Sequence, residues 1–206
     1  MIKVVSFDIG GTLIKGQNDE VNTKYDLKAL SKLVDLDYEN VRKVYKNIFQ
    51  KTNGTFDELL ELFCTCLKIH RTEELDDFFL NKFKSDSKNI SDEDIKILKK
   101  LKDMGYKVIL FSNSCSLIKN NIVDVVSNIV DGVFYSYETG YTKSDSESYK
   151  HIEKIFNYEP INFLHIGDTL KSDYIDPIKN GWNALYYGTT EDESVKSIKN
   201  LNEIFN

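Results

Sequence analysis

Two kinds of hydrophobic pattern alternate along the chain. Short runs of β-branched and aromatic residues, which predict buried strands, occur near the N-terminus and again throughout the second half of the sequence. These runs are VVSF, KVILFS, GVFYSY, NFLHIG and NALYYG. Helical patterns separate the later runs, and strands that alternate with helices are typical of an α/β fold with a parallel sheet. The pattern therefore predicts a parallel sheet flanked by helices.

A long helical stretch interrupts this alternation after the first run. From about residue 22 to residue 84, apolar residues recur every three or four positions in YDLKALSKLV, YENVRKVYKNIF, FDELLELFCTCL and ELDDFFLNKF. Polar segments rich in helix-breaking residues lie on either side of it. We therefore expect an all-helical domain of residues 17–87, inserted into a core domain of residues 1–16 and 88–206.

The second part of the core begins with clear helix signals. Ser91, followed three residues later by Asp94, predicts an N-cap before the pattern IKILKKL. Gly105 then predicts the end of that helix, because glycine readily adopts the left-handed conformation of a C-terminal cap.

Composition and charge exclude several classes of partner. The chain has 206 residues, of which 41% are hydrophobic, so it can bury one substantial core. Its net charge is -6 and its 27 basic residues are spread evenly, which argues against a nucleic-acid partner. Because no apolar segment approaches membrane-spanning length, we expect a cytoplasmic protein with no membrane partner. Composition does not distinguish a monomer from a homodimer.

Small polar or acidic residues stand at the ends of three predicted strands. Asp8 follows VVSF, Ser112 ends VILFS, and Asp168 follows FLHIG. Ligands bind beyond the carboxyl ends of the strands in an open parallel sheet, so we expect these side chains to converge. Asp173 adds a further carboxylate nearby, and a set of carboxylate oxygens suits a hard cation such as Mg²⁺. A capping role for the loop around Asp168 is compatible with the same arrangement.

Four segments of the chain together resemble the motifs of the haloacid dehalogenase (HAD) superfamily. They are DIGGTL, FSNS, GYTKSD and GDTLKSD, in this order, with the helical insertion after the first. The resemblance covers essentially the whole core and implies a Rossmann-like fold with a small helical cap of the C1 type. It also implies a Mg²⁺-dependent phosphohydrolase of the phosphatase-like branch. Such an enzyme acts on a small phosphorylated metabolite through an aspartyl-phosphate intermediate.

The resemblance implies a role for each motif residue. Asp8 would be the nucleophile, Ser112 would hydrogen-bond a phosphoryl oxygen, and Lys143 would fix the nucleophile and neutralise charge on the transferring group. The metal ligands implied are Asp8, the backbone carbonyl of Gly10, Asp168 and Asp173. The substrate-binding residues implied are Gly11, Thr12 and Asn113.

Two positions depart from the family pattern. Lys143 is followed by Ser144, where close relatives usually have proline. Gly10 stands where most phosphatases of the superfamily have an aspartate that protonates the leaving group. General acid–base assistance typically contributes about 10²- to 10⁴-fold, and poor leaving groups need it most. Gly10 therefore favours a substrate with a good leaving group, such as an acyl phosphate, a phosphoanhydride or an aryl phosphate.

Gly10 also leaves other interpretations open. The acid could come from the cap or from a bound water, or the chain could be a catalytically impaired binding or regulatory protein. Metal-independent haloacid dehalogenases and phosphonate hydrolases lack the same aspartate. We rank a dehalogenase below a phosphatase, because Asp168 and Asp173 form the acidic pair that a magnesium site needs. The only two arginines, Arg42 and Arg71, lie in the predicted cap, where either could bind an anionic substrate or simply be a solvated surface residue.

Overall fold

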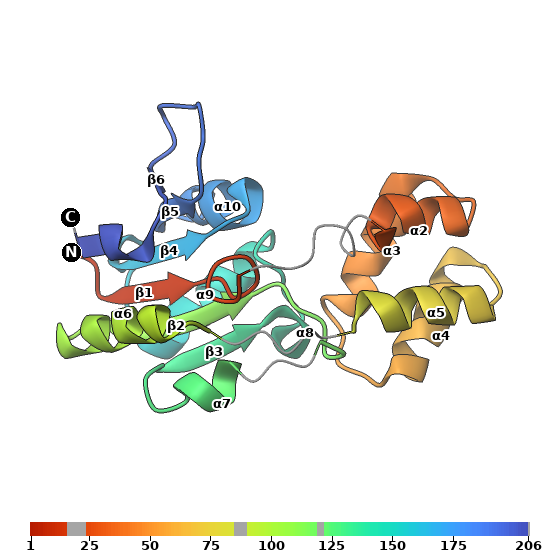
Figure 1. Cartoon of the computed structure of the whole chain (residues 1–206), viewed down its shortest axis with the longest axis horizontal. Coiled ribbons are helices and arrows are strands. Elements are labelled where there is room, and N and C mark those ends of the chain that lie inside the picture. The colour runs from red at the N-terminus through yellow and green to blue at the C-terminus, as the bar shows by residue number, and fades with distance from the viewer. Residues whose placement is uncertain (16–23, 85–89, 119–121, 206) are drawn as a thin grey trace.

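The core of the computed structural model is a six-stranded parallel sheet with the strand order β3-β2-β1-β4-β5-β6 (Figure 1). The structure describes residues 1–15, 24–84, 90–118 and 122–205. The strands are β1 (Val4–Phe7), β2 (Lys107–Ser112), β3 (Gly132–Tyr135), β4 (Phe163–Gly167), β5 (Asn183–Tyr187) and β6 (Ser197–Ile198). The first five coincide with the five predicted runs, so the α/β, Rossmann-like architecture is confirmed. Strand β3 ends before the SY of its run, because those residues begin a short helix.

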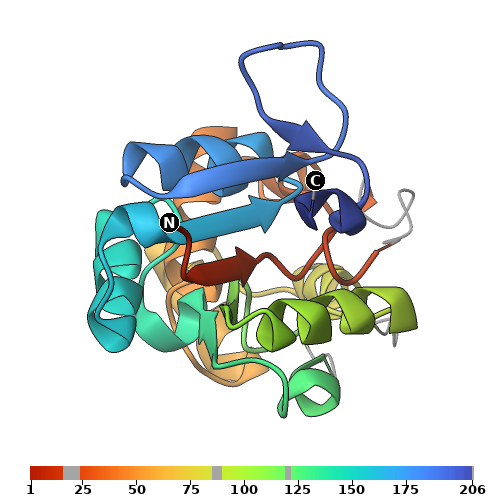
Figure 2. The same ribbon diagram turned by 90° about the vertical axis from the view of Figure 1, so that its left-hand side faces the viewer.

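Helices pack against both faces of the sheet (Figure 2). The helices of the core are α6 (Asp92–Asp103), α7 (Ile122–Val126), α8 (Ser136–Thr139), α9 (Ser146–Phe156) and α10 (Asp176–Lys179). Short 3₁₀ helices at Pro160–Asn162 and Leu201–Phe205, and a wide helical turn at Leu170–Ile175, complete the elements. Helix α6 starts at the predicted cap, where the Ser91 hydroxyl accepts a hydrogen bond from the Asp94 backbone N–H at 3.1 Å.

Alternation along the strands divides the core into two hydrophobic layers. Val5 and Phe7 of β1 pack with α6 and α7 on one face, whereas Val4 packs with α9 and Trp182 on the other. Because successive side chains of a strand point to opposite faces, a run that is apolar at every position predicts a sheet covered on both sides.

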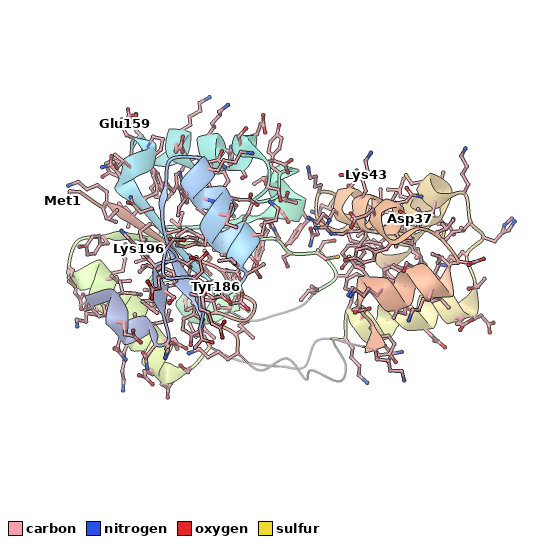
Figure 3. All side chains as sticks on the ribbon, turned by 90° about the horizontal axis from the view of Figure 1, so that it is seen from above. Met1, Asp37, Lys43, Glu159, Tyr186 and Lys196 are labelled. Carbon is pink, nitrogen blue, oxygen red and sulfur yellow. The ribbon has the colours of Figure 1, made fainter. Side chains whose placement is uncertain are left out.

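The stretch between β1 and α6 forms a separate helical lobe (Figures 1 and 3). Its helices are α2 (Leu27–Leu33), α3 (Tyr38–Phe49), α4 (Phe56–Leu67) and α5 (Glu73–Lys82). A cluster of aromatic rings centred on Phe49 and Phe79, whose centroids lie 4.7 Å apart, fills the interior of the lobe. The expected boundaries of this domain, between residues 16 and 17 and between 87 and 88, involve residues outside the described part of the chain.

Several contacts join the helical lobe to the sheet domain beside the carboxyl end of β2. The Ser116 hydroxyl donates a hydrogen bond to the Gly54 carbonyl at 3.0 Å, and Cys115 packs into the hydrophobic core of the lobe. Lys51 Nζ lies 2.7 Å from Asp145 Oδ2. These contacts place the C-terminal end of α3 close to the loop that carries Lys143. Within the described part of the chain, no helix has the length and hydropathy needed to cross a bilayer.

Candidate active site

Three adjacent strands deliver the predicted site residues to one edge of the sheet. Strand β1 lies between β2 and β4, and all three run parallel. Their carboxyl ends therefore bring Asp8, Ser112 and Asp168 together, as the positions at the strand ends predicted. Asp173 reaches the same edge from the wide helical turn after β4.

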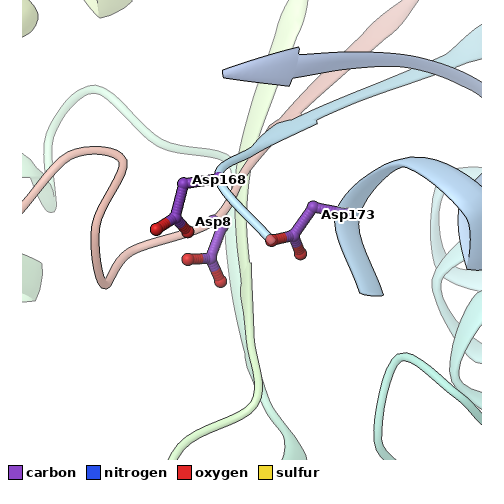
Figure 4. Close-up of side chains that lie close together, drawn as sticks. All are labelled: Asp8, Asp168 and Asp173. Atoms are coloured by element: carbon purple, nitrogen blue, oxygen red, sulfur yellow. The ribbon is translucent and has the colours of Figure 1, made fainter. Parts of the chain in front are cut away.

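The carboxylates of Asp8, Asp168 and Asp173 form a compact cluster (Figure 4). Each contributes one oxygen to a group of atoms that all lie within 4.8 Å of one another. Burial raises the pKa of Asp8 to about 6, Lys143 counteracts this shift, and the charges of Asp173 and Asp168 reinforce it. Burial and the charge of Asp173 likewise raise the pKa of Asp168. Like charges held this close favour a bound cation.

The glycines beside the cluster allow the close approach of these carboxylates. A Cβ atom on Gly11, whose φ is +81°, would lie 2.0 Å from Asp168 Oδ2, and one on Gly167 would lie 2.5 Å from Asp173 Cγ. By contrast, a Cβ atom on Gly10 would have no atom within 4 Å. The first two glycines are thus required by the geometry of the carboxylates, whereas Gly10 leaves free space in front of them.

The donor set fits a magnesium ion. Carboxylate oxygens are the ligands that Mg²⁺ takes from proteins, together with water and phosphate oxygens. Asp8, Asp168 and Asp173 supply such oxygens, and the backbone carbonyl of Gly10 lies in the same loop. Among the residues that the structure describes, no histidine or cysteine belongs to the cluster, which argues against the softer transition metals.

Lys143 is buried in contact with two of the carboxylates. Its side chain is 1% exposed, and Nζ lies 2.5 Å from Asp8 Oδ1 and 2.6 Å from Asp173 Oδ1. Burial alone would lower the pKa of Lys143, but the two carboxylates raise it above its ordinary value, so the ammonium is charged. Its Nζ can therefore fix the Asp8 carboxylate and neutralise charge next to it.

The backbone of Lys143 is also held in place. Its N–H donates to Asn113 Oδ1 at 2.8 Å, and the Tyr149 hydroxyl donates to its carbonyl at 2.8 Å. Asn113 thus orients the loop of Lys143, in addition to lining the pocket described below. Ser144 follows Lys143 without disturbing this arrangement, so the family's proline is not needed to place the ammonium.

A hydrogen-bonded chain continues behind the site to the buried His165. Its Nε2 lies 3.2 Å from Asp173 Oδ1, and its Nδ1 lies 2.9 Å from Ser6 Oγ. Burial and the nearby ammonium of Lys143 lower the pKa of His165 to about 4, so the imidazole is neutral near pH 7. An ionised Asp173 can only accept, which assigns the ring proton to Nε2 and makes Nδ1 the acceptor from Ser6.

This buried histidine predicts a loss of stability in weak acid. In the unfolded chain the imidazole has its ordinary pKa of 6.5, so the unfolded state binds the proton first as the pH falls. The contribution of His165 to the free energy of unfolding is complete above pH 6.5 and decreases towards pH 4, by about 3 kcal/mol. The raised pKa of Asp8 acts in the opposite direction over the same window, because there the folded state takes up the proton first. The expected result is therefore a difference: measured by urea unfolding in EDTA, the free energy of unfolding should fall less with decreasing pH in H165Q, which keeps a donor for Asp173 but cannot titrate, than in the wild type.

The exposed His151 provides the matched control for this experiment. H151Q should retain the wild-type pH dependence of the free energy of unfolding. The same pH dependence in H165Q as in the wild type would contradict the assigned contribution of His165.

A pocket of about 340 Å³ opens between the carboxyl edge of the sheet and the helical lobe. Its lining includes the predicted residues Asp8, Gly10, Ser112, Asn113, Lys143 and Asp173. Two predicted substrate-binding residues, Gly11 and Thr12, are not among the lining residues, and Thr12 is fully buried. The Thr12 hydroxyl has no hydrogen-bond partner among the described residues.

Sequence reasoning missed part of the pocket lining. The additional residues are Lys46, Gln50, Ser144, Thr169, Lys171, Ser172 and Asp176. Of the two arginines, only Arg42 lines the pocket. Arg71 instead contacts carboxylates of its own lobe, with its Nε 2.7 Å from Asp76 Oδ1. A sequence signal for Lys46 and Gln50 did exist, since both share a helix face with Arg42.

Comparisons with known proteins agree with this arrangement. The family model of the haloacid dehalogenase-like hydrolases matches residues 2–175. Among solved structures, the HAD family enzyme bt-2542 from Bacteroides thetaiotaomicron is 18% identical, with a TM-score of 0.65 over 100% of this chain and 98% of its own. A predicted HAD-like family hydrolase from Porphyromonas gingivalis is 17% identical, with the same TM-score and the same coverage of both chains.

Other solved structures with this fold differ in what their names state. The L-2-haloacid dehalogenase RSc1362 is 15% identical, with a TM-score of 0.64 over 98% of this chain and 96% of its own. The Bacteroides enzyme has also been solved in complex with magnesium and inorganic phosphate, and that structure has a TM-score of 0.59 over 94% of this chain and 98% of its own, at 18% identity. These similarities show the fold. No curated protein matches the chain in sequence.

Proposed function

The chain belongs to the haloacid dehalogenase-like hydrolase family, and we propose that it is a Mg²⁺-dependent phosphohydrolase with Asp8 as its nucleophile. One observation carries this proposal: Asp8 shares a cluster of cation-binding geometry with Asp168 and Asp173, while Lys143 contacts Asp8 directly. The magnesium and phosphate complex of the Bacteroides enzyme supports the same choice of metal and substrate group. The proposed substrate is a small phosphorylated metabolite.

The proposed reaction has two steps on Asp8. A carboxylate oxygen of Asp8 attacks phosphorus, the bond from phosphorus to the leaving oxygen breaks, and an aspartyl-phosphate forms. Water then attacks this phosphorus and releases a proton to the solvent, while the bond from phosphorus to Asp8 breaks, which gives inorganic phosphate and the free carboxylate. Bound Mg²⁺ would neutralise charge on the phosphoryl oxygens. Lys143 adds a positive charge on the side of Asp8, and the Ser112 hydroxyl can donate to a phosphoryl oxygen.

The pocket favours a substrate with a good leaving group. Among the described residues of the lining, all three carboxylates come from the sheet domain, and none comes from the helical lobe. Asp8 and Asp173 contact Lys143, while Asp176 is held by Lys171 at 2.8 Å. Among the described residues of the lobe, no carboxylic acid therefore takes the place of the one missing at Gly10. An acyl, anhydride or aryl phosphate needs no such acid, because its leaving oxygen is stable as an anion.

A metal-independent dehalogenase is the alternative that the shared fold suggests, since RSc1362 carries that name. The cluster of Asp8, Asp168 and Asp173 favours the phosphohydrolase, because three adjacent carboxylates suit a bound cation, which a metal-independent dehalogenase does not use. We further propose that the helical lobe acts as a C1-type cap that closes the pocket over the substrate.

The decisive test is a panel of substrates assayed with and without Mg²⁺. Phosphate release should require Mg²⁺ and should be faster for acetyl phosphate and aryl phosphates than for sugar phosphates. Chloride release from 2-chloropropionate in EDTA would instead support the dehalogenase. An absence of both activities would favour a non-catalytic binding protein.

A further inference from the structure

Helix α3 presents a row of polar side chains to the pocket. Arg42, Lys46 and Gln50 follow one another at intervals of four residues, so they lie on one face of the helix, and all three line the pocket. The neighbouring row, which starts at Val41, is buried in the hydrophobic core of the helical lobe. The packing of that apolar row therefore fixes the direction in which the polar row faces.

The two cations of this row are poorly compensated. Lys46 forms no ion pair with any described residue. Arg42 pairs with Glu39 alone among the described residues, at 3.1 Å, and the Glu39 side chain is 69% exposed. Exposed ion pairs contribute little, so Glu39 leaves most of the positive potential of Arg42 available.

A third cation faces the row from the sheet domain. Lys171, in the turn after β4, lines the same pocket and is held by Asp176 at 2.8 Å. Burial lowers the pKa of Lys46, and the positive charges of Arg42 and Lys171 lower it further, while the charges of Asp176 and Asp145 counteract part of this shift. The net effect is repulsion of the Lys46 ammonium by the two other cations, and an anion placed beside Lys46 would relieve it.

An unused hydrogen-bond acceptor lies in the same row. Oε1 of Gln50 is buried and has no partner among the described residues. Buried polar atoms are normally paired, so an orphaned one in a pocket lining points to a ligand group that completes it.

The row is longer than a single phosphoryl group. Eight residues of helix separate Arg42 from Gln50, which corresponds to about 12 Å along the axis. The Gln50 end lies near the phosphoryl site, because the adjacent Lys51 contacts Asp145 on the loop of Lys143. A phosphoryl group on Asp8 therefore leaves the Arg42 end for another part of the substrate.

We infer that Arg42, Lys46 and Lys171 form a subsite for a second anionic group of the substrate, a carboxylate or a second phosphate. This inference rests on the proposed function and narrows the substrate class to small phosphate compounds that carry two separated anionic groups. Gln50 accepts a hydrogen bond from a polar group between the two.

Binding of non-hydrolysable phosphonates tests the subsite without turnover. Isothermal titration with Mg²⁺ would compare propylphosphonate, 3-phosphonopropionate and propane-1,3-diphosphonate. The second anion should lower Kd by about tenfold, since a charge-assisted contact of this kind contributes about 1.5 kcal/mol. The preference for the carboxylate or the phosphonate as second group then identifies which anion the subsite takes.

Turnover of a matched substrate pair provides the second measurement. 3-Carboxyphenyl phosphate and 3-carbamoylphenyl phosphate have similar leaving groups and differ in one negative charge. The ratio of their kcat/KM values should exceed about 10 in the wild type and fall towards unity in R42Q and K46Q. K43Q is the matched control, because Lys43 lies on the same helix but is exposed and outside the pocket lining (Figure 3). It should retain the wild-type ratio.

The outcomes separate the subsite from the proposed function. R42Q and K46Q could instead reduce binding and kcat/KM equally for ligands with one and with two anionic groups. In that case the cations serve only the transferring phosphoryl group, so the proposed subsite is wrong while the proposed phosphohydrolase activity stands. If no phosphate is hydrolysed but the second anion still tightens binding in the wild type and not in K46Q, the subsite stands and the proposed activity is wrong.

Discussion

Replacement of Asp8 by asparagine should abolish the hydrolysis of every phosphate substrate, with a loss of about 10⁴-fold or more. The amide has nearly the same shape as the carboxylate, but it is a poor nucleophile and cannot form the aspartyl-phosphate. It also removes one of the three charges of the metal cluster and one of the two carboxylates that contact Lys143. The chemistry and the charge balance of the site both depend on this one residue.

Two measurements distinguish this loss from misfolding. Acid quenching during turnover of a ³²P-labelled substrate should trap label on the wild-type protein and none on D8N. D103N replaces an exposed aspartate at the end of α6 and serves as the matched control, with full activity expected. Wild-type turnover in D8N would overturn the assignment of the nucleophile, and with it the proposed mechanism.

Local patterns predicted the strands and the residues at their ends because both depend on few neighbours. A strand buried on both faces needs a continuous apolar run, and a parallel sheet brings the ends of such runs to one edge. Asp8, Ser112 and Asp168 could therefore be placed together from sequence. Strand β6 could not be predicted, since its two residues pair with β5 without forming a hydrophobic run of their own.

The roles of the two arginines could not be separated from sequence. Arg42 and Arg71 both lie in helical, charged surroundings in the sequence, and only the tertiary structure distinguishes them. Arg71 forms ion pairs with Asp57 of α4 and Asp76 of α5, and it does not belong to the pocket lining. Arg42 faces the sheet domain because the packing of α3 turns its face in that direction. Such contacts between distant segments determine which charged residue is available for a ligand.

The contacts of the buried Asp173 also could not be predicted from the sequence. His165 belongs to NFLHIG, one of the runs that predict buried strands, and the structure buries it fully. The sequence does not show that His165 is hydrogen-bonded to Asp173, the carboxylate that also accepts from Lys143. Asp173 therefore connects the Lys143 ammonium to the interior of the sheet. Burial alone would raise the pKa of Asp173, but its contacts with Lys143 and His165 hold it below the ordinary value.

The second large effect is expected at Gly10, where substitution by aspartate should increase activity. A side chain fits at this position, because a Cβ atom would have no neighbour within 4 Å and the residue is exposed to the pocket. G10D would supply a proton to the leaving oxygen, so kcat/KM for alkyl phosphates such as sugar phosphates should rise by about 10²- to 10⁴-fold. Acyl and aryl phosphates should change little, since their leaving groups depart without a proton.

The measurement is the dependence of log kcat/KM on the pKa of the leaving group, which should become shallower in G10D than in the wild type. G10N is the matched control: it adds a side chain of nearly the same size without a proton to transfer, and it should keep the steep dependence. Equal gains in G10D and G10N would attribute the effect to filled space. A wild type that already prefers alkyl phosphates would contradict the proposed preference for a good leaving group, and another acid would have to protonate the leaving oxygen. Lys46, the pocket cation without an ion pair among the described residues, would then be the first position to substitute.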